Sequence, residues 1–197
     1  MKGEKLFTTY YEPGLIRQNI DNVVLRTYRH IKGFATDDPD NSTKIIYTPR
    51  VEVEKRIQDM FDIFGEDKGI SITSIVGVDN REKYLFLLDC GIEVSDENER
   101  ELMDVLENSL DDFPALKDGM ILRTQNSYHV VGFVPLSHEE WIQHMGRAIL
   151  LNIKNKEPIS DIRYIGHSLE RGYGSLRMSD YLGKPTPDVI GHIVKNK

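Results

Sequence analysis

The chain has 197 residues, of which 39% are hydrophobic and 29% charged, and its formal net charge is −7. This composition is typical of a folded globular protein and excludes a collagen-like or largely disordered chain. The acidic balance also argues against a protein coated with basic surface for non-specific nucleic-acid binding.

Membrane, secreted and zinc-binding classes are disfavoured as well. No apolar run approaches the ~20 residues that a membrane span requires, and the N-terminal segment MKGEKLFTTYYEPG lacks the apolar stretch and cleavage site of a secretory signal. Cys90 is the only cysteine, which excludes an intrachain disulfide and a zinc site built from several cysteines. We therefore expect a cytoplasmic protein with no membrane partner.

Charge is distributed unevenly along the chain. Residues 1–120 hold 15 basic and 25 acidic residues, whereas residues 121–197 hold 10 basic and 7 acidic ones. Two interpretations stay open: chance variation of the surface, or a C-terminal part that faces an anionic partner such as phosphate groups.

Residues 1–80 are predicted to form a smaller α/β module. Residues 13–31 have apolar positions spaced for a helix, with Pro13 near its start. A polar, turn-forming cluster at residues 35–42 predicts an exposed loop. A strand, a helix and another strand are then expected, at residues 44–47, about 50–64 and about 69–77.

Residues 81–197 have a clearer alternation of strands and helices. Ser95 and Ser137 are good N-caps, each in front of an amphipathic helix that runs to about residue 110 or 151. Strands are predicted at residues 84–89, 120–125, 128–134 and 161–165. The β-α-β-β-α-β order is that of ferredoxin-like and RRM-like sheets. We predict an α+β fold in which this sheet packs on the N-terminal module.

Two strands of the predicted sheet, at residues 84–89 and 128–134, are apolar at both parities. Such a sheet should be covered on both faces. Its own two helices would cover one face, which leaves the other for the N-terminal module or for a dimer interface.

The predicted topology brings three chemistry-bearing residues to one edge of the sheet. The first and third strands are antiparallel neighbours, and the fourth lies on the other side of the first. Asp89 ends the first strand, His129 lies at the start of the third, and Asp161 begins the fourth. We therefore expect these side chains to meet.

Each of these residues also has a purely structural interpretation. Asp89, two residues before a glycine, suits a turn, and His129 suits a core histidine bonded to a backbone carbonyl. Asp161 could be a cap or part of a surface ion pair, and Arg177 an ordinary edge-strand charge. Convergence on one sheet edge favours the functional interpretation.

With these residues in place, the sequence resembles the archaeo-eukaryotic primase superfamily over about residues 82–190. That superfamily has an acidic motif at the end of the first core strand, a Ser-x-His motif, and a third motif in which aspartate follows a hydrophobic position. The matching segments are Leu87-Leu88-Asp89-Cys90-Gly91, Ser127-Tyr128-His129 and Ile159-Ser160-Asp161. Ser175-Leu176-Arg177-Met178-Ser179 and the later Lys184-Pro185 are similar to segments that often follow the third motif.

The resemblance implies a primase-type nucleotidyltransferase that takes nucleoside triphosphates and a DNA or RNA template. Asp89 and Asp161 would hold Mg²⁺ or Mn²⁺ for two-metal catalysis. The triphosphate would be contacted by the Ser-x-His motif and by arginine donors, namely Ser127, His129, Arg163, Arg171 and Arg177. A replication protein or a second copy of the chain would be a further partner.

The first motif departs from the superfamily pattern of two acidic residues separated by one, because the second position is Gly91. Glu93 has the right strand parity but lies ~7 Å further along. It joins Asp89 as a metal ligand only if the chain bends at the glycine.

Two alternatives to an active enzyme follow. One is a catalytically inactive primase-like domain that acts as a nucleotide-binding, nucleic-acid-binding or oligomerisation module. The other is a simple ferredoxin-like RNA-binding or oligomerisation domain, although residues 127–134 lack the aromatic pattern of the usual RNA-binding sheet.

Overall fold

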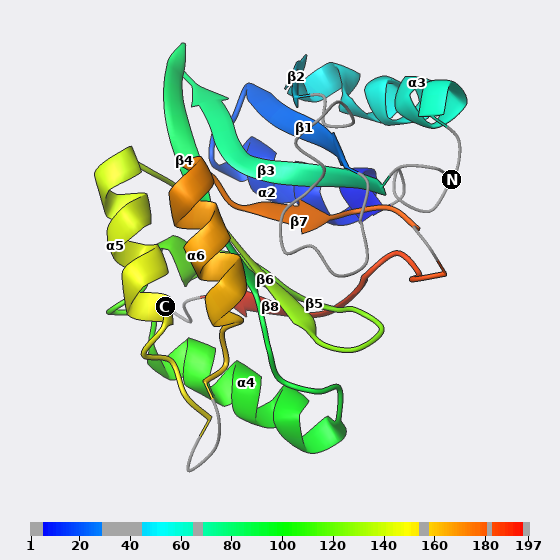
Figure 1. The fold of residues 1–197 in the computed structure, drawn as a ribbon. Coiled ribbons are helices and arrows are strands. Elements are labelled where there is room, and N and C mark those ends of the chain that lie inside the picture. Colours follow the sequence, from blue (N-terminus) through cyan, green and yellow to red (C-terminus); the bar gives the residue numbers. More distant parts are fainter. Residues whose placement is uncertain (1–5, 29–44, 65–68, 154–157, 181–182, 195–197) are drawn as a thin grey trace.

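A computed structural model describes residues 6–28, 45–64, 69–153, 158–180 and 183–194. Over these residues the chain has five α-helices and an open antiparallel sheet of eight strands (Figure 1). This confirms the predicted α+β class. In the same residues, no helix is long and apolar enough to span a membrane. The loop expected at residues 35–42 lies outside the described residues.

The helix predicted over residues 13–31 is wrong beyond Arg17. A π-helical turn, η1 (Phe7–Tyr11), leads into the short helix α2 (Glu12–Arg17), and strand β1 (Asn22–Tyr28) follows. Asn19 has a φ of 52°, in the left-handed region that ends a helix. The β-branched Val23 and Val24 then favour a strand, which is buried on both faces between its two neighbours.

The next three elements confirm the predicted strand, helix and strand. They are β2 (Ile45–Pro49), a 3₁₀ turn η2 (Arg50–Glu52) that continues into α3 (Val53–Phe64), and β3 (Gly69–Val78). The apolar face of α3 is buried at Val53, Ile57 and Met60.

The following elements also agree with the predictions, and both serine caps are formed. The elements are β4 (Arg81–Asp89), α4 (Asp96–Asn108), β5 (Asp118–Arg123), β6 (Tyr128–Leu136) and α5 (His138–Ala148). A 3₁₀ turn that was not predicted, η4 (Pro114–Lys117), precedes β5. The Ser95 hydroxyl accepts the Asn98 amide at 3.1 Å. Ser137 and Glu140 form a capping box, with each side chain accepting the other residue's backbone amide.

The strand predicted at residues 161–165 is wrong. Helix α6 (Ile162–Arg171) occupies this position, followed by β7 (Ser175–Arg177) and β8 (Asp188–Val194). Asp161 is the N-cap of α6, which starts the helix at once. Only Ser160 pairs with the end of β4, in an isolated bridge to Cys90. The fourth strand of the predicted β-α-β-β-α-β unit is therefore reduced to this single bridge.

The strand order in the sheet is β2-β1-β3-β4-β6-β5-β8, with β7 paired to β3. One edge of β3 is shared by two strands. Residues 75–78 pair with β4, whereas residues 71–73 pair with β7. We call the place where β4 leaves this edge and β7 replaces it the fork.

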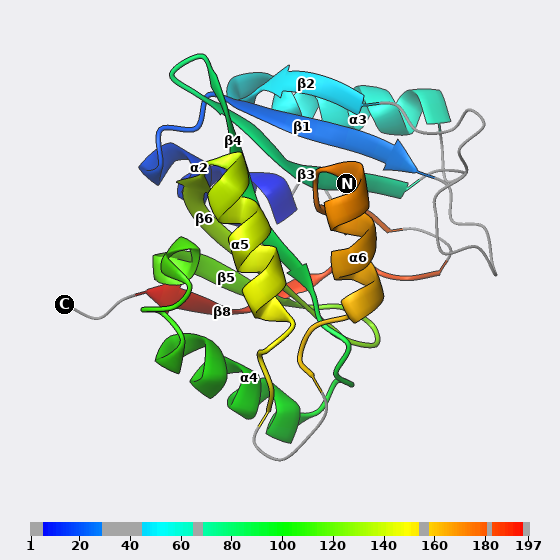
Figure 2. The same ribbon diagram turned by 60° about the vertical axis from the view of Figure 1, so that its left-hand side comes forward.

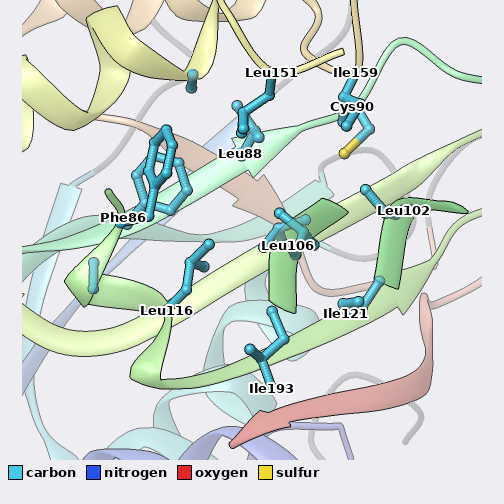
Figure 3. Close-up of a cluster of buried hydrophobic side chains, with 14 of the residues drawn as sticks. Phe86, Leu88, Cys90, Leu102, Leu106, Leu116, Ile121, Leu151, Ile159 and Ile193 are labelled. Atoms are coloured by element: carbon cyan, nitrogen blue, oxygen red, sulfur yellow. The ribbon is translucent and has the colours of Figure 1, made fainter. Parts of the chain in front are cut away.

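Both faces of the β4-β6-β5 part of the sheet are covered. On one face, Phe86 and Leu88 pack with α4 and α5 side chains in the cluster of Figure 3. On the other, Leu85 and Leu87 pack with residues from η1, α2, β1 and α3. Figure 2 shows α5 and α6 side by side on the face away from α2.

A polar contact fixes α2 to β5 across about half of the sequence. Arg17 donates from Nη2 to Asp118 Oδ1 at 2.6 Å and from Nε to Oδ2 at 3.1 Å, and Gln18 donates to Oδ2 at 3.0 Å. Partial burial alone would raise the pKa of Asp118, but these hydrogen bonds outweigh it and hold the pKa below its ordinary value. The contact therefore stabilises the fold when the carboxylate is ionised.

We expect Asp118→Asn to lower the free energy of unfolding by about 1 kcal/mol at pH 7, because Arg17 is half exposed and screened. A lowered folded pKa means that the contribution is present above the unfolded value of about 3.9 and is lost as pH falls through the folded pKa. Urea unfolding of wild type and variant at pH 7 and at pH 3 tests this. The matched control is Asp59→Asn, whose partner Arg56 lies 3.9 Å away on the exposed face of α3. An equal loss in both variants would contradict the prediction.

Candidate functional site

The fork sets the position of the candidate site. After Tyr84, which pairs with Ile75, β4 leaves β3, continues beside β6 and ends at Asp89. Strand β7 stays beside β3 and ends at Arg177. Both strands are antiparallel to β3, so they run in the same direction from the fork. Asp89 and Arg177 therefore lie on opposite sides of the opening of the fork.

Asp89 and His129 are direct neighbours across β4 and β6. The two residues are in register, and the His129 Nε2 lies 3.7 Å from the Asp89 Oδ1. Alternation along the strands places both on the face of the sheet that is covered by the N-terminal elements, whereas Leu88 and Val130 lie on the opposite face. The structure thus brings together two of the three residues predicted to meet.

Asp161 reaches the same place although it is not in a strand. Its backbone amide donates to the Asp89 carbonyl at 3.0 Å, and the Gly91 amide donates to Ile159 at 2.8 Å. The Asp161 carboxylate accepts the amides of Arg163 and Tyr164 at 2.9 and 3.3 Å. Asp161 is therefore both a neighbour of Asp89 and a helix cap.

The surroundings shift the pKa values of the pair strongly. Burial, followed by the negative charge of Asp161, raises the pKa of Asp89 to about 7, against the opposing effect of Lys184 and Arg177. Burial, with the positive charge of Arg177, lowers the pKa of His129 to about 3. At neutral pH the imidazole is uncharged, so its contact with Asp89 is not an ion pair.

His129 has an available hydrogen-bonding group. Its Nδ1 is buried and has no hydrogen-bond partner among the residues that the structure describes. Buried polar atoms without partners are uncommon in folded proteins and often belong to binding or catalytic sites.

Arg177 organises the segment that follows β7. Its Nη1 donates to the backbone carbonyls of Ser179, Lys184 and Pro185. The segment so held carries Lys184, whose charge lowers the pKa of Asp89. Sequence reasoning noted Lys184 only as part of a family-like segment and gave it no role. We call Asp89, His129, Asp161, Arg177 and Lys184 the Asp89 cluster.

Of the other residues predicted for the site, Arg163 contacts a member of this cluster, and the other three have different contacts. Ser127 belongs to the β5–β6 turn, where its amide donates to Thr124 at 3.0 Å. The Arg163 side chain is 84% exposed and 3.7 Å from Asp161. Arg171 lies over the Tyr173 ring, 5.5 Å from its centroid. Glu93 is exposed, and its carbonyl accepts the Asn98 side chain.

The side chains available as metal ligands indicate which kind of metal site the cluster could form. Among the residues described, no group of three or more His, Cys, Asp or Glu side chains is arranged to hold a metal ion. Asp89 and Asp161 supply two carboxylates, of which one caps α6. This does not fit a two-metal centre. It fits a single Mg²⁺ or Mn²⁺ held together with ligand phosphates, since such ions often take only one or two carboxylates.

Tyr164 closes the fork behind the cluster. From α6 its hydroxyl donates to the Leu87 carbonyl of β4 at 3.1 Å. A Cβ at Gly174 would lie only 2.7 Å from this hydroxyl, so glycine permits the close approach. The tyrosine hydroxyl is thus bonded to β4 and lies close to the glycine that precedes β7.

Comparison with known proteins gives one match. A family model described as AEP-like, archaeo-eukaryotic primase 1D-like, matches residues 52–185. This range contains every member of the Asp89 cluster. No curated protein and no solved structure matches the chain.

Tyr164→Phe should lower the free energy of unfolding by about 1–3 kcal/mol, because it leaves the Leu87 carbonyl without its donor inside the protein. Tyr47→Phe removes the same hydroxyl from a side chain that is largely exposed on β2, and we expect a change below about 0.5 kcal/mol. Thermal and urea unfolding of both variants provide the comparison. A Tyr164 variant as stable as the Tyr47 variant would show that the hydroxyl does not hold the fork.

Asp161→Asn should lower the pKa of Asp89 from about 7, because it removes the neighbouring negative charge that favours the protonated form. Asparagine is as good an N-cap as aspartate, so α6 should stay intact. Carbon-13 NMR titration of the aspartate carboxyl groups measures the shift directly. Asp96→Asn, in the first turn of α4, is the control and should leave the Asp89 titration unchanged.

Proposed function

The chain belongs to the archaeo-eukaryotic primase 1D-like family, and from this premise we propose that it is a primase-like domain that binds a nucleoside triphosphate at the Asp89 cluster. The observation that carries the proposal is the uncharged, buried His129 beside Asp89 and two cationic side chains, with an Nδ1 that has no hydrogen-bond partner within the described part of the chain. A DNA or RNA template is the second ligand that we propose, with DNA replication as the setting and the cytoplasm as the compartment.

The cations and the imidazole suit phosphate groups. A neutral imidazole keeps one N–H, which can donate to a phosphate oxygen. The Lys184 ammonium would offset part of the phosphate charge, while the guanidinium of Arg177, already bonded to three carbonyls, would keep Lys184 in place. Arg163, Arg171 and Ser127 stay candidates for contacts to a longer ligand.

The raised pKa of Asp89 is compatible with an anionic ligand. A carboxylate beside phosphates is repelled unless it binds a proton or a cation. With a pKa of about 7, Asp89 is partly protonated at neutral pH and can accept either. Asp89 and Asp161 would hold one Mg²⁺ or Mn²⁺ ion, which when bound would supply Lewis-acid polarisation of the phosphate oxygens.

Nucleotidyl transfer is the second candidate, favoured by the neighbouring positions of Asp89 and Asp161. In addition to nucleotide binding, this reaction needs a centre for two metal ions. The described residues offer no third carboxylate for the cluster, which favours a binding module over a two-metal enzyme. The partner of such a module would be a replication protein or a second copy of the chain.

Isothermal titration with ATP, in the presence and absence of Mn²⁺, tests the proposal on wild type, Asp89→Asn and Lys184→Met. We expect Lys184→Met to weaken binding about tenfold, which is ~1.4 kcal/mol. Asp89→Asn should abolish any metal-dependent part of the affinity. Glu93→Gln is the matched control, because its carboxylate lies outside the Asp89 cluster.

Each outcome has a distinct meaning. Metal-dependent binding that Asp89→Asn removes supports a metal–nucleotide site and leads to primer-extension assays. Binding that ignores metal but depends on Lys184 supports the inactive module. An absence of ATP binding in the wild type would overturn the proposal.

A further inference from the structure

Helices α5 and α6 carry the same exposed pattern. Ile142, Gly146 and Ile149 on α5, and Ile162, Gly166 and Leu169 on α6, are each spaced four and then three residues apart. Residues with this spacing lie along one face of a helix. We call these six residues the paired stripe; Ile149 is the C-cap of α5 and continues its face.

The paired stripe is open to solvent. Its large side chains, Ile142, Ile149, Ile162 and Leu169, are 43%, 36%, 53% and 37% exposed. Nothing lies within 4 Å of a Cβ built at Gly146 or Gly166. A glycine inside a helix is less favourable than an alanine, and no neighbour in the described chain requires either one. Space for another molecule's backbone would account for both glycines.

The two stripes face the line along which α5 and α6 lie side by side, which we call the seam. The Ser160 hydroxyl donates to the Ala148 carbonyl, so α6 begins beside the end of α5, and the helices lie antiparallel side by side (Figure 2). Ile142 follows the buried Trp141 by one residue, as Gly166 follows the buried Ile165. This gives both stripes the same rotational offset from the buried side of their helix. On antiparallel neighbours in this arrangement, that offset turns both stripes toward the seam.

Charge is separated along the seam. At one end lie Glu139 and Glu140 near the start of α5 and Glu170 near the end of α6, with Arg171 as a basic side chain among them. At the other end lie Arg147 in the last turn of α5 and Arg163 near the start of α6, with the α6 cap Asp161 as an acidic side chain. The Arg163 and Glu170 side chains are 84% and 74% exposed, so both are accessible to a partner. The apolar stripe therefore has an acidic and a basic end.

We propose that the paired stripe is the interface of a homodimer with two-fold symmetry. We place the two-fold axis across the two helices, so that in the isologous contact each stripe meets its own copy reversed end to end. The acidic end of one stripe then lies on the basic end of the other, which places Arg163 against Glu170 twice. The glycines let the helix pairs approach closely over the apolar centre. This charge self-complementarity selects a second copy of the chain over an unrelated partner.

Sedimentation equilibrium of the full chain over a wide concentration range tests the dimer. Gly166→Gln adds bulk to the seam but is a better helix former. It should weaken association at least tenfold while raising the melting temperature of the dilute monomer. Because these two effects have opposite signs, misfolding cannot imitate them. The matched pair Ile142→Asp and Ile63→Asp compares the stripe with an exposed isoleucine of α3, which should have no effect.

Charge reversal tests the proposed symmetry. Arg163→Glu and Glu170→Arg should each weaken the dimer, and the double variant should recover association because the reversed charges face each other again. A chain that is monomeric at every concentration would overturn the proposal. So would a dimer that is insensitive to Gly166→Gln and Ile142→Asp, since its interface would then lie elsewhere.

Discussion

The shared edge of β3 is the constraint on which the rest of the structure depends. A strand edge can pair with only one neighbour at each position, so β4 must leave where β7 begins. This departure directs the end of β4 toward β6 and separates it from β7. The backbone groups exposed at the divergence need other partners, and the Tyr164 hydroxyl supplies one for Leu87. The position of Asp89 relative to Arg177 is a result of this single branching.

Local signals in the sequence were sufficient for most elements but not for the two that failed. Ser95 and Ser137 cap their helices as the sequence predicted, because a cap depends on residues within one turn. Val23, Val24 and Leu25 are consecutive apolar residues, which fit a buried strand as well as a helix face, and only pairing with β2 and β3 decides between them. Asp161 was predicted to begin a strand, with a cap as one alternative; its acceptance of two amides shows that the cap is formed.

The candidate site was predictable as far as sheet register extends. Asp89 and His129 meet because a strand end and a strand start are neighbours in an antiparallel pair, which the topology alone implies. Lys184 could not be placed in this way, since its position depends on hydrogen bonds from Arg177 to an irregular segment. Glu93 fails to join the cluster for a related reason. After Gly91 the chain does not continue as a strand, so strand parity no longer fixes which way its side chain points.

The single carboxylate of Asp161 has two structural roles. It holds the first amides of α6, and it stands beside Asp89, where a bound ion or phosphate would act on its charge. A ligand that drew the carboxylate away would leave the first turn of α6 without its acceptor and so favour fraying there. If the cluster binds the ligand that we propose, its occupancy and the order at the start of α6 are thermodynamically linked, and linkage is reciprocal. An interaction that stabilises the first turn of α6 would therefore also oppose movement of the Asp161 carboxylate from the helix to a ligand.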